Sequence, residues 1–144
     1  MLGRLFRFVL AFVRALLAPG RRPLPPRDPD GLTIEYRPRL DGRPDPGEVV
    51  WTWVTFEDDP SQGKDRPVLL IGRRRGTLVG VALTSKPHPR FQIEVGRGAW
   101  DRDGRTSYAK IDRLIDVDEA RVRREGAVLD RARFQRVVDA IGRA

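Results

Sequence analysis

Arginine, lysine, carboxylate and hydroxyl side chains must carry any chemistry of this 144-residue chain, because the sequence contains no cysteine and a single histidine. The lack of cysteine excludes disulfides and thiolate metal sites, and His88 alone leaves too few imidazoles for a zinc site. His88 stands between Pro87 and Pro89, which favours an exposed loop residue over the alternative of a general base. The sequence also lacks a glycine-rich phosphate loop and Ser-His-Asp spacing. Arginine is left as the main group that can stabilise an anion.

Two acidic stretches have the composition of metal sites but not the spacing. Glu57–Asp59 are consecutive, and consecutive side chains of an extended chain point in alternating directions, so they seldom converge on one ion. Asp101, Asp103 and Asp112 resemble a calcium loop, but Arg105 stands where a ligand is required and the glycine comes too early. We therefore expect a solvated loop and a β-turn, and neither a metal ion nor another cofactor.

The net charge of +8 suggests a polyanionic partner, but most of it lies in one part of the chain. Residues 1–44 hold nine arginines and four acidic residues, which is +5, and the other hundred residues hold +3. Arginine outnumbers lysine 25 to 3, which fits phosphate recognition by planar guanidinium groups or a bias in the coding sequence.

Residues 1–18 predict an amphipathic helix. Arg4, Arg7 and Arg14 fall within one narrow sector of an otherwise apolar helix. The longest apolar run is far shorter than the roughly 20 residues that span a bilayer, and Arg14 interrupts the apolar stretch that a signal peptide would need. Two interpretations remain open for residues 2–17: peripheral contact with anionic lipid, or packing on this domain or a partner.

Five prolines in residues 19–31 predict an extended linker, after which residues 32–144 are expected to form one domain. Strands are predicted at residues 32–36, 48–54, 66–72, 77–85, 91–95 and 107–117 from their β-branched, aromatic and continuous apolar runs. Gly80 marks a bulge or a close approach of another chain segment. The connections are too short for helical crossovers, so the fold class is mainly β, as a small closed barrel.

Two helices are predicted at the C-terminal end. Asp118 is a plausible cap for a helix over residues 119–125, and Asp130 caps a second helix. Phe134, Val137, Val138 and Ile141 follow helical spacing and should cover one end of the barrel.

The segment PGEVVWTWVTFEDDPSQGKDRPVLLIG, followed by LTSK, resembles the MazF/PemK toxin pattern. In that pattern P-G-D/E-I/V-V opens a strand, a glycine-bearing loop precedes R-P-V/A-L-V-I, and a later strand ends in T-S. SYAKIDRLIDVDEARVRREG resembles the later block of the family. The resemblance covers residues 46–126 and implies an SH3-like barrel.

The resemblance also implies an activity and its residues. Members of the family are endoribonucleases, usually homodimers, inhibited by an antitoxin. Arg66 and Thr84 match the catalytic arginine and threonine, with Ser85 beside Thr84, and Ser107 matches a position near the RNA groove. Six basic residues could follow RNA phosphates: Lys64, Arg73, Arg74, Arg75, Lys86 and Arg90.

Two positions depart from the family pattern. Only Lys64 and Asp65 separate Gly63 from Arg66, where many members have a longer insertion in the loop that gates the groove. Asp112 is followed by Arg113 where D/E-Q-I-R is usual. Among the aromatic residues, Trp51, Trp53 and Phe91 could stack on bases if they are exposed.

The expected function is a metal-independent endoribonuclease toxin of a type II toxin-antitoxin system. It would act in the cytoplasm on single-stranded RNA, through attack by the 2′-hydroxyl group, with a cognate antitoxin as partner and as a homodimer. An alternative is a catalytically inactive SH3-like module that binds protein or nucleic acid and is held at a membrane by residues 2–17.

Overall fold

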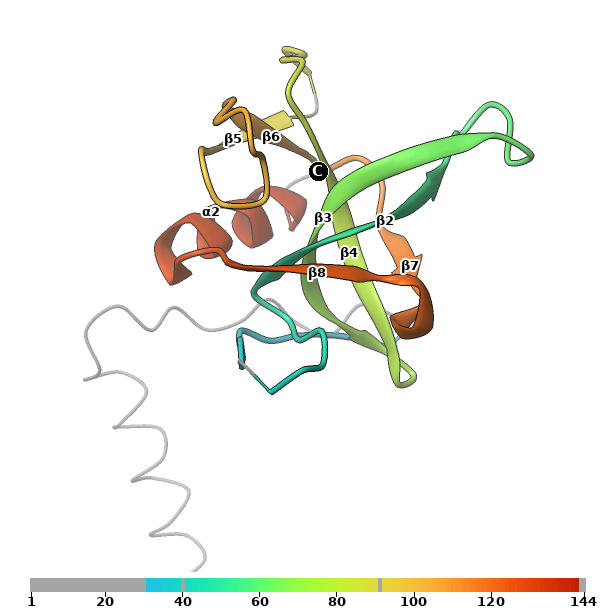
Figure 1. Cartoon of the computed structure of the whole chain (residues 1–144), viewed down its shortest axis with the longest axis vertical. Helices are drawn as coiled ribbons and strands as arrows, with labels where there is room; N and C mark the ends of the chain where they lie inside the picture. The colour runs from blue at the N-terminus through green and yellow to red at the C-terminus, as the bar shows by residue number, and fades with distance from the viewer. Residues whose placement is uncertain (1–30, 40, 91, 143–144) are drawn as a thin grey trace, which may run out of the picture.

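A strongly curled antiparallel sheet with one α-helix packed against it forms the described part of the chain (Figure 1). The computed structural model describes residues 31–39, 41–90 and 92–142. The helix predicted for residues 1–18 and nearly all of the 19–31 linker lie outside the described residues.

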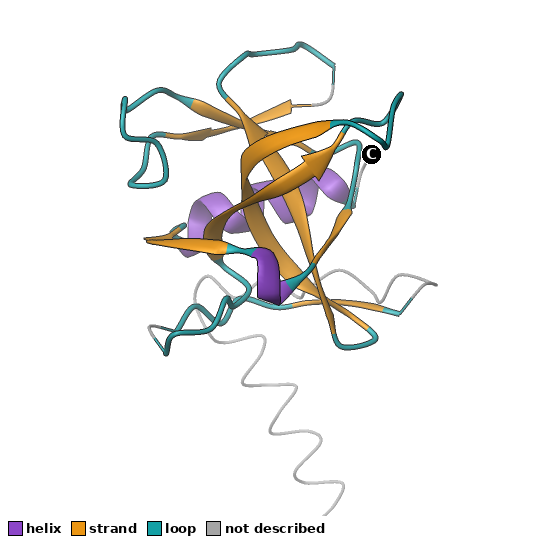
Figure 2. Cartoon of the chain, turned by 45° about the vertical axis from the view of Figure 1, so that its right-hand side comes forward, coloured by secondary structure: helices purple, strands orange, loops and turns teal. Residues whose placement is uncertain are grey.

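The strands follow one another in a path of order β5-β6-β4-β3-β2-β8, with β1 paired to β3 and β7 paired to β4. Their bounds are β1 Leu32–Ile34, β2 Glu48–Thr55, β3 Gly63–Arg74, β4 Thr77–Thr84, β5 Gln92–Gly96, β6 Ser107–Lys110, β7 Ile115–Val117 and β8 Arg123–Val128. The helical elements are a 3₁₀ turn, Glu119–Arg121, and α2, Arg131–Ile141. In Figure 2 the strands cross in front of α2, and the 3₁₀ turn lies on the near side.

The central strand β3 is buried on both faces, as its continuous apolar run predicts. Leu69 and Ile71 belong to the larger core cluster, which includes α2. Val68 and Leu70 belong to a smaller cluster inside the curl, together with Val117 of β7. Because side chains alternate along a strand, the even-numbered residues of β3 face into the curl.

Helix α2 covers the larger cluster as expected. Phe134, Val137 and Val138 are buried, and Ile141 packs against them half-buried. The ring of Phe134 lies 5.0 Å from that of Tyr36, whose hydroxyl donates a hydrogen bond of 2.7 Å to the carbonyl of Leu129. The predicted lid is therefore confirmed, and it joins the start of the domain to its end.

The close approach predicted at Gly80 is present. A Cβ atom there would lie 2.4 Å from Val68 Cγ1, and the register between β3 and β4 shifts beside it. Gly72 is equally constrained, since a Cβ atom would lie 2.1 Å from the carbonyl oxygen of Thr33 in the paired strand β1.

The helix predicted for residues 119–125 is wrong, so the chain has one C-terminal α-helix in its described part. Asp118 does cap, through its carboxylate and the amide of Ala120, but only a 3₁₀ turn follows. The chain then pairs as β8 with the edge of β2, where Val49 lies opposite Ala127. Helix propensity is a weak preference, and the hydrogen bonds of that ladder override it.

Other boundaries also differ. The predicted strand 107–117 is two strands, β6 and β7, separated by a turn, and β3 begins three residues earlier than expected, at Gly63. The barrel is a curled open sheet, because β5 and β8 end the path and are not paired with each other in the described residues. No helix in the described residues is long and apolar enough to cross a membrane.

Candidate functional site

Arg66 lies where the even-numbered row of β3 leaves the core. Val68 is fully buried, Arg66 is half-buried and Lys64 is exposed, so the three side chains run from the inside of the curl to its mouth. Thr52 of β2 is opposite Arg66 in the ladder and is 7% exposed. The strand therefore delivers a guanidinium group to the mouth of the curled sheet.

Thr84 shares the face of Arg66. Val68 is paired with Ala82, and because side chains alternate along a strand, Arg66 and Thr84, each two residues further along, point to the same side as this pair. The β3–β4 ladder ends at this pair, and Thr84 is paired with Tyr108 of β6. The Thr84 hydroxyl accepts a hydrogen bond of 3.2 Å from the amide of Lys86. Its own proton is left to donate elsewhere.

A cavity of about 240 Å³ opens beside Arg66. Its walls come from the end of β2, the loop after it, and strands β3, β4, β6 and β7: Val54, Thr55, Phe56, Glu57, Asp58, Arg66, Ala82, Lys110, Arg113 and Ile115. The charged lining residues are the cations Arg66, Lys110 and Arg113 and, on the loop after β2, the acids Glu57 and Asp58. We call this cavity and the face of Lys64, Thr84 and Lys86 the groove.

The electrostatics of the groove are those of an anion site. Burial, and after it the positive charge of Arg113, lowers the pKa of the Arg66 guanidinium. With the described residues Arg66 makes no ion pair and no side-chain hydrogen bond. An arginine remains charged at neutral pH, so this half-buried cation lacks a counter-ion from the described part of the chain.

The pKa of Lys64 is also lowered by neighbouring positive charges. The charge of Arg66 is the largest cause of its lowered pKa, followed by burial and then by Lys86 and Lys110. Three cations, Arg66, Lys86 and Lys110, therefore lie near enough to Lys64 to repel its charge. Mutual repulsion of this kind is relieved by a bound anion, which favours the charged form of each group.

Sequence reasoning missed two residues of the groove, Lys110 and Arg113. Lys110 comes next to Ala82 when the β4–β6 register, in which Leu83 faces Ala109, is continued. Arg113 reaches across to β2, where Nη1 donates to the Thr55 carbonyl at 2.7 Å and Nη2 to Thr55 Oγ1 at 3.3 Å. Nothing in the local sequence signals these contacts, because they depend on pairing between distant strands.

Three of the proposed RNA-binding arginines lie at the other end of β3. Arg73 pairs with Glu119 at 2.9 Å and Arg74 approaches Asp116 at 3.9 Å, while Arg75 forms the β3–β4 turn with a positive φ of 50°. Arg74 follows Arg66 by eight positions along the curled strand, and none of the three arginines lines the cavity. These arginines are outside the groove.

The remaining predicted residues are dispersed. Ser85 is half-buried directly after β4, and Arg90 is exposed in the loop before β5. Ser107 is 3% exposed, and its hydroxyl accepts a hydrogen bond of 2.9 Å from the Trp100 indole. A direct contact of Ser107 with RNA would require the Trp100 indole to move away.

The acidic stretches behave as loops and turns. Asp59 accepts hydrogen bonds from the amide and hydroxyl of Ser61, and Asp101 accepts from Asp103 N and Arg105 Nε, each at 2.9 Å. In the described residues no group of three or more His, Cys, Asp and Glu side chains is placed to hold a metal ion.

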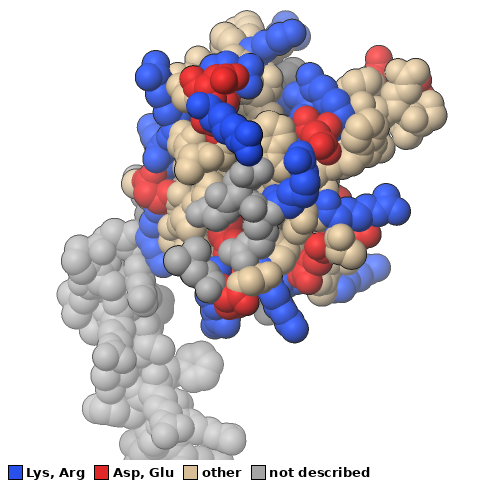
Figure 3. All heavy atoms as spheres, in the orientation of Figure 1, with Lys and Arg blue, Asp and Glu red and all other residues tan. Residues whose placement is uncertain are grey.

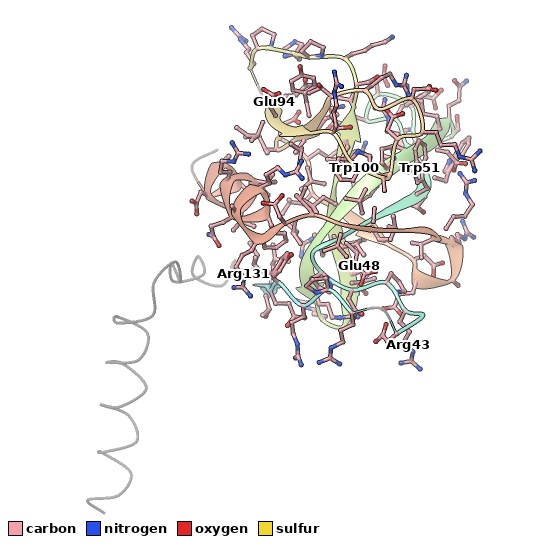
Figure 4. The ribbon with its side chains drawn as sticks, turned by 60° about the vertical axis from the view of Figure 1, so that its left-hand side comes forward. Arg43, Glu48, Trp51, Glu94, Trp100 and Arg131 are labelled. Carbon is pink, nitrogen blue, oxygen red and sulfur yellow. The ribbon has the colours of Figure 1, made fainter. Side chains whose placement is uncertain are left out.

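Trp51 and Trp53 point to the face of β2 opposite the groove. Trp51 donates a hydrogen bond of 2.8 Å from its indole to the Trp100 carbonyl, and the labels of the two residues lie close together in Figure 4. Trp53 is 57% exposed. Stacking of bases on these rings would therefore occur outside the groove.

Charge elsewhere on the described surface is mixed. Figure 3 shows one face, on which basic and acidic side chains are scattered among uncharged ones. Several arginines outside the groove are paired, such as Arg123 with Asp65 at 2.8 Å and Arg105 with Asp101 at 2.9 Å. Others, such as Arg75, Arg90, Arg97 and Arg102, make no ion pair with the described residues. The groove differs because its cations include the half-buried Arg66 and lie close enough to lower one another's pKa.

The fold and the groove define a small, mainly β protein that presents cations and a hydroxyl group at the mouth of a curled sheet. The family model described as PemK-like, MazF-like toxin of type II toxin-antitoxin system matches residues 45–144, and the chain belongs to this family. This confirms the resemblance that the sequence motifs predict.

Comparison with solved structures supports the fold. The chain is similar to one in the crystal structure of MazE-MazF (Form-II) from Deinococcus radiodurans, with a TM-score of 0.51, 19% identity, and coverage of 72% of this chain and 95% of that chain. At this identity the likeness concerns the fold. No curated protein matches the chain.

Proposed function

We propose that the protein is a metal-independent endoribonuclease toxin that cleaves single-stranded RNA in the groove. The observation that carries the proposal is Arg66, a half-buried guanidinium with no acidic partner in the described residues, on the same sheet face as the Thr84 hydroxyl. Membership of a toxin family whose studied members are endoribonucleases supports the same conclusion.

The reaction needs no nucleophile from the protein. The RNA 2′-oxygen forms a bond to phosphorus while the bond from phosphorus to the 5′-oxygen breaks, which yields a 2′,3′-cyclic phosphate and a 5′-hydroxyl end. The 2′-hydroxyl loses a proton and the leaving oxygen gains one. Negative charge grows on the phosphoryl oxygens between these states, and a positioned guanidinium binds that charge more strongly than it binds the starting phosphodiester.

Each groove residue has a role in this scheme. Arg66 presents a planar fork to two phosphoryl oxygens. Thr84, whose oxygen already accepts from the Lys86 amide, donates its proton to a phosphoryl oxygen or orients the 2′-hydroxyl. Lys64, Lys86 and Lys110 bind flanking phosphates. Arginine is a poor general base at neutral pH, so its part is electrostatic.

Cleavage of a labelled single-stranded RNA pool in the presence of EDTA tests the proposal. We expect products that end in 2′,3′-cyclic phosphate, and we expect Arg66→Ala to lower the rate about 10²- to 10³-fold. Arg123→Ala removes an arginine from the opposite face and should cleave normally. Undiminished cleavage by Arg66→Ala would contradict the mechanism, and no cleavage by the unmodified chain would favour an RNA-binding module without activity.

We also propose a cognate antitoxin as a partner, since the similar structure is that of MazE-MazF, and a second copy of the chain, since homodimers are usual in the family. A short antitoxin-like reading frame beside this one, whose product abolishes cleavage on co-expression, is the expected result. Light scattering of the purified chain reports the dimer, and a monomer that cleaves RNA fully would contradict it.

Residues 2–17 are proposed to contact anionic lipid, on the strength of their basic sector and apolar remainder. The full chain should co-sediment with vesicles that contain phosphatidylserine and not with neutral vesicles. Replacement of Phe6, Phe8 and Phe12 by alanine should abolish co-sedimentation, and equal binding to both vesicle types would contradict lipid recognition by charge.

A further inference from the structure

Arg113 owes its place in the groove to an irregularity of the sheet. Both β6 and β7 pair with β4, but Gly80 and Leu83 are three positions apart in β4, whereas their partners Ile115 and Ala109 are six positions apart. The three extra residues bulge out of the ladder in the turn between β6 and β7. That turn carries Arg113 to the wall of the cavity.

Two different kinds of contact hold the Arg113 guanidinium. Its Nη1 and Nη2 atoms donate to the carbonyl and hydroxyl of Thr55, at 2.7 and 3.3 Å, which fixes the group against the end of β2. Its Nε atom lies 3.7 Å from Glu57 Oε1, which is an ion pair without a hydrogen bond. The Glu57 side chain is 57% exposed on the loop after β2. Arg113 can therefore lose its contact with Glu57 while its hydrogen bonds to Thr55 remain.

A loose, exposed ion pair contributes little free energy. The Arg113 side chain is 27% exposed, and its charge lowers the pKa of Arg66. A phosphodiester placed between Arg66 and Arg113 would form an ion pair with both cations. The Glu57 carboxylate forms one with Arg113 alone. The phosphate is therefore the stronger partner, and the carboxylate is the one displaced.

We propose that Arg113 is a substrate-binding residue of the groove and that Glu57 occupies it in the free protein as an internal competitor, to be replaced by a phosphate of the incoming RNA. This inference rests on the proposed RNA substrate. The exchange happens when RNA binds, before charge grows on the reacting phosphate. Arg113 and Glu57 should therefore act on KM and on binding, and leave kcat nearly unchanged.

The experiment measures binding and cleavage separately. A random-sequence, fluorescent single-stranded DNA dodecamer serves as the binding probe, because it has the phosphates of RNA but no 2′-hydroxyl to react. Cleavage of the RNA pool gives kcat and KM for the same variants of the full chain. Two readouts separate a positioning effect on the fold from a contact with phosphate.

Glu57→Gln keeps the size of the side chain and the Arg113–Thr55 anchor, and removes the competing charge. We expect probe binding and KM to improve about twofold to fivefold, the range that loss of an exposed ion pair allows. Asp65→Asn is the matched control. It deletes the same charge next to Arg66 in the sequence, but Asp65 pairs with Arg123 on the other face of β3. It should change binding by less than about 1.5-fold, since exposed charges farther apart are screened.

Arg113→Gln should raise KM at least tenfold, as expected for loss of a charged hydrogen-bonding partner of phosphate. Glu57→Gln should give no further improvement in the Arg113→Gln background, because the competitor then has nothing to block. Arg113→Lys keeps the charge without the fork to Thr55 and should fall between. If Arg113→Gln fails to fold, Glu57→Gln and Arg113→Lys still decide the question.

Each outcome has one meaning. Equal gains from Glu57→Gln and Asp65→Asn, or an undiminished gain in the Arg113→Gln background, overturn the exchange. An effect of Arg113 variants on kcat alone overturns its binding role. Probe binding that responds to Glu57→Gln without any RNA cleavage overturns the proposed endoribonuclease while the exchange stands.

Discussion

Arg66 acquires its properties from its position in a row of alternating side chains. Two residues further into the sheet, Val68 is fully buried, and two residues outward, Lys64 is exposed. Arg66 is thus shielded enough for its charge to be felt strongly, yet open to the cavity. A cation at such a boundary interacts with an anion in a lower effective dielectric than at an open surface.

Two substitutions separate the chemical role of the Thr84 hydroxyl from its structural role. Thr84→Val keeps the branched shape but removes the hydroxyl, and we expect kcat/KM to fall about 10- to 100-fold, as for loss of a hydrogen bond to a charged group. Thr84→Ser retains the hydroxyl and the bond from the Lys86 amide, and should remain within about threefold of the unmodified chain. Steady-state cleavage of the RNA pool measures both.

The kinetic effect of Thr84→Val must be distinguished from an effect of losing the hydrogen bond between the Lys86 amide and the Thr84 hydroxyl. Thr84→Val also removes the acceptor for the Lys86 amide, so thermal unfolding of both variants should accompany the kinetics. Wild-type kcat/KM in Thr84→Val, with an unchanged melting temperature, would show that the hydroxyl takes no part in the reaction.

At the residue level, the motifs single out Arg66 and Thr84, and each lies two residues beyond Val68–Ala82, the pair that ends the β3–β4 ladder on that side. Lys110 and Arg113 could not be predicted, since their approach to Arg66 depends on the β4–β6 register and on the three extra residues after β6. Arg73–Arg75 look equally suitable in the sequence, but the length of β3 carries them away from the groove.

At the level of elements, alternation and apolar runs predict most strands. In β3 and β4 the signal is strong because the buried residues form a continuous apolar run within the strand itself. Residues 119–125 are mispredicted for the opposite reason. Their local pattern is compatible with a helix, and only the open edge of β2, distant in sequence, makes a strand the better choice. The 107–117 segment fails similarly, at a turn that has no glycine or proline to mark it.

The start of α2 provides a prediction about pH. Asp130 Oδ2 accepts from the Arg133 amide at 3.1 Å, and its carboxylate pairs with the Arg133 guanidinium, whose Nη1 atom also donates to the Val95 carbonyl at 2.6 Å. The side-chain hydrogen bond from Arg133 is the largest cause of the lowered pKa of Asp130. This cluster ties the helix cap to strand β5.

Because the folded-state pKa of Asp130 lies below its ordinary value of 3.8, its charge stabilises the folded protein fully above that pH. The contribution should decline as the pH falls through the folded-state pKa and vanish below it. The stability difference between the unmodified chain and Asp130→Asn, from urea unfolding at pH 2.5 to 7, should follow this curve. Asp130→Ala, which removes the cap as well, should cost about 1 kcal/mol at pH 7, and a pH-independent Asn difference would contradict the role of the charge.

Over the whole molecule, the arrangement of charge matters more than its total. Outside the groove, arginines such as Arg73 and Arg123 are matched with Glu119 and Asp65. Within it, Lys64, Arg66, Lys86 and Lys110 make no ion pair with the described residues. The last hundred residues, which carry only +3 of the net charge, thus still concentrate a positive field at one mouth of the sheet.

The salt dependence of binding tests this arrangement across the molecule. Each phosphate neutralised on a single strand adds about −0.7 to the slope of log K against log salt concentration, so three or more contacts in the groove predict a slope steeper than about −2. Lys110→Ala should reduce the magnitude of the slope by about 0.7, whereas Arg73→Ala and Arg75→Ala, at the far end of β3, should leave it unchanged. The slopes come from fluorescence anisotropy of the single-stranded DNA dodecamer, measured from about 50 to about 300 mM KCl, a range around physiological ionic strength. An equal loss of slope in Arg73→Ala and Lys110→Ala would mean that the nucleic acid runs along β3 to the β3–β4 turn, and that the groove is only part of its path.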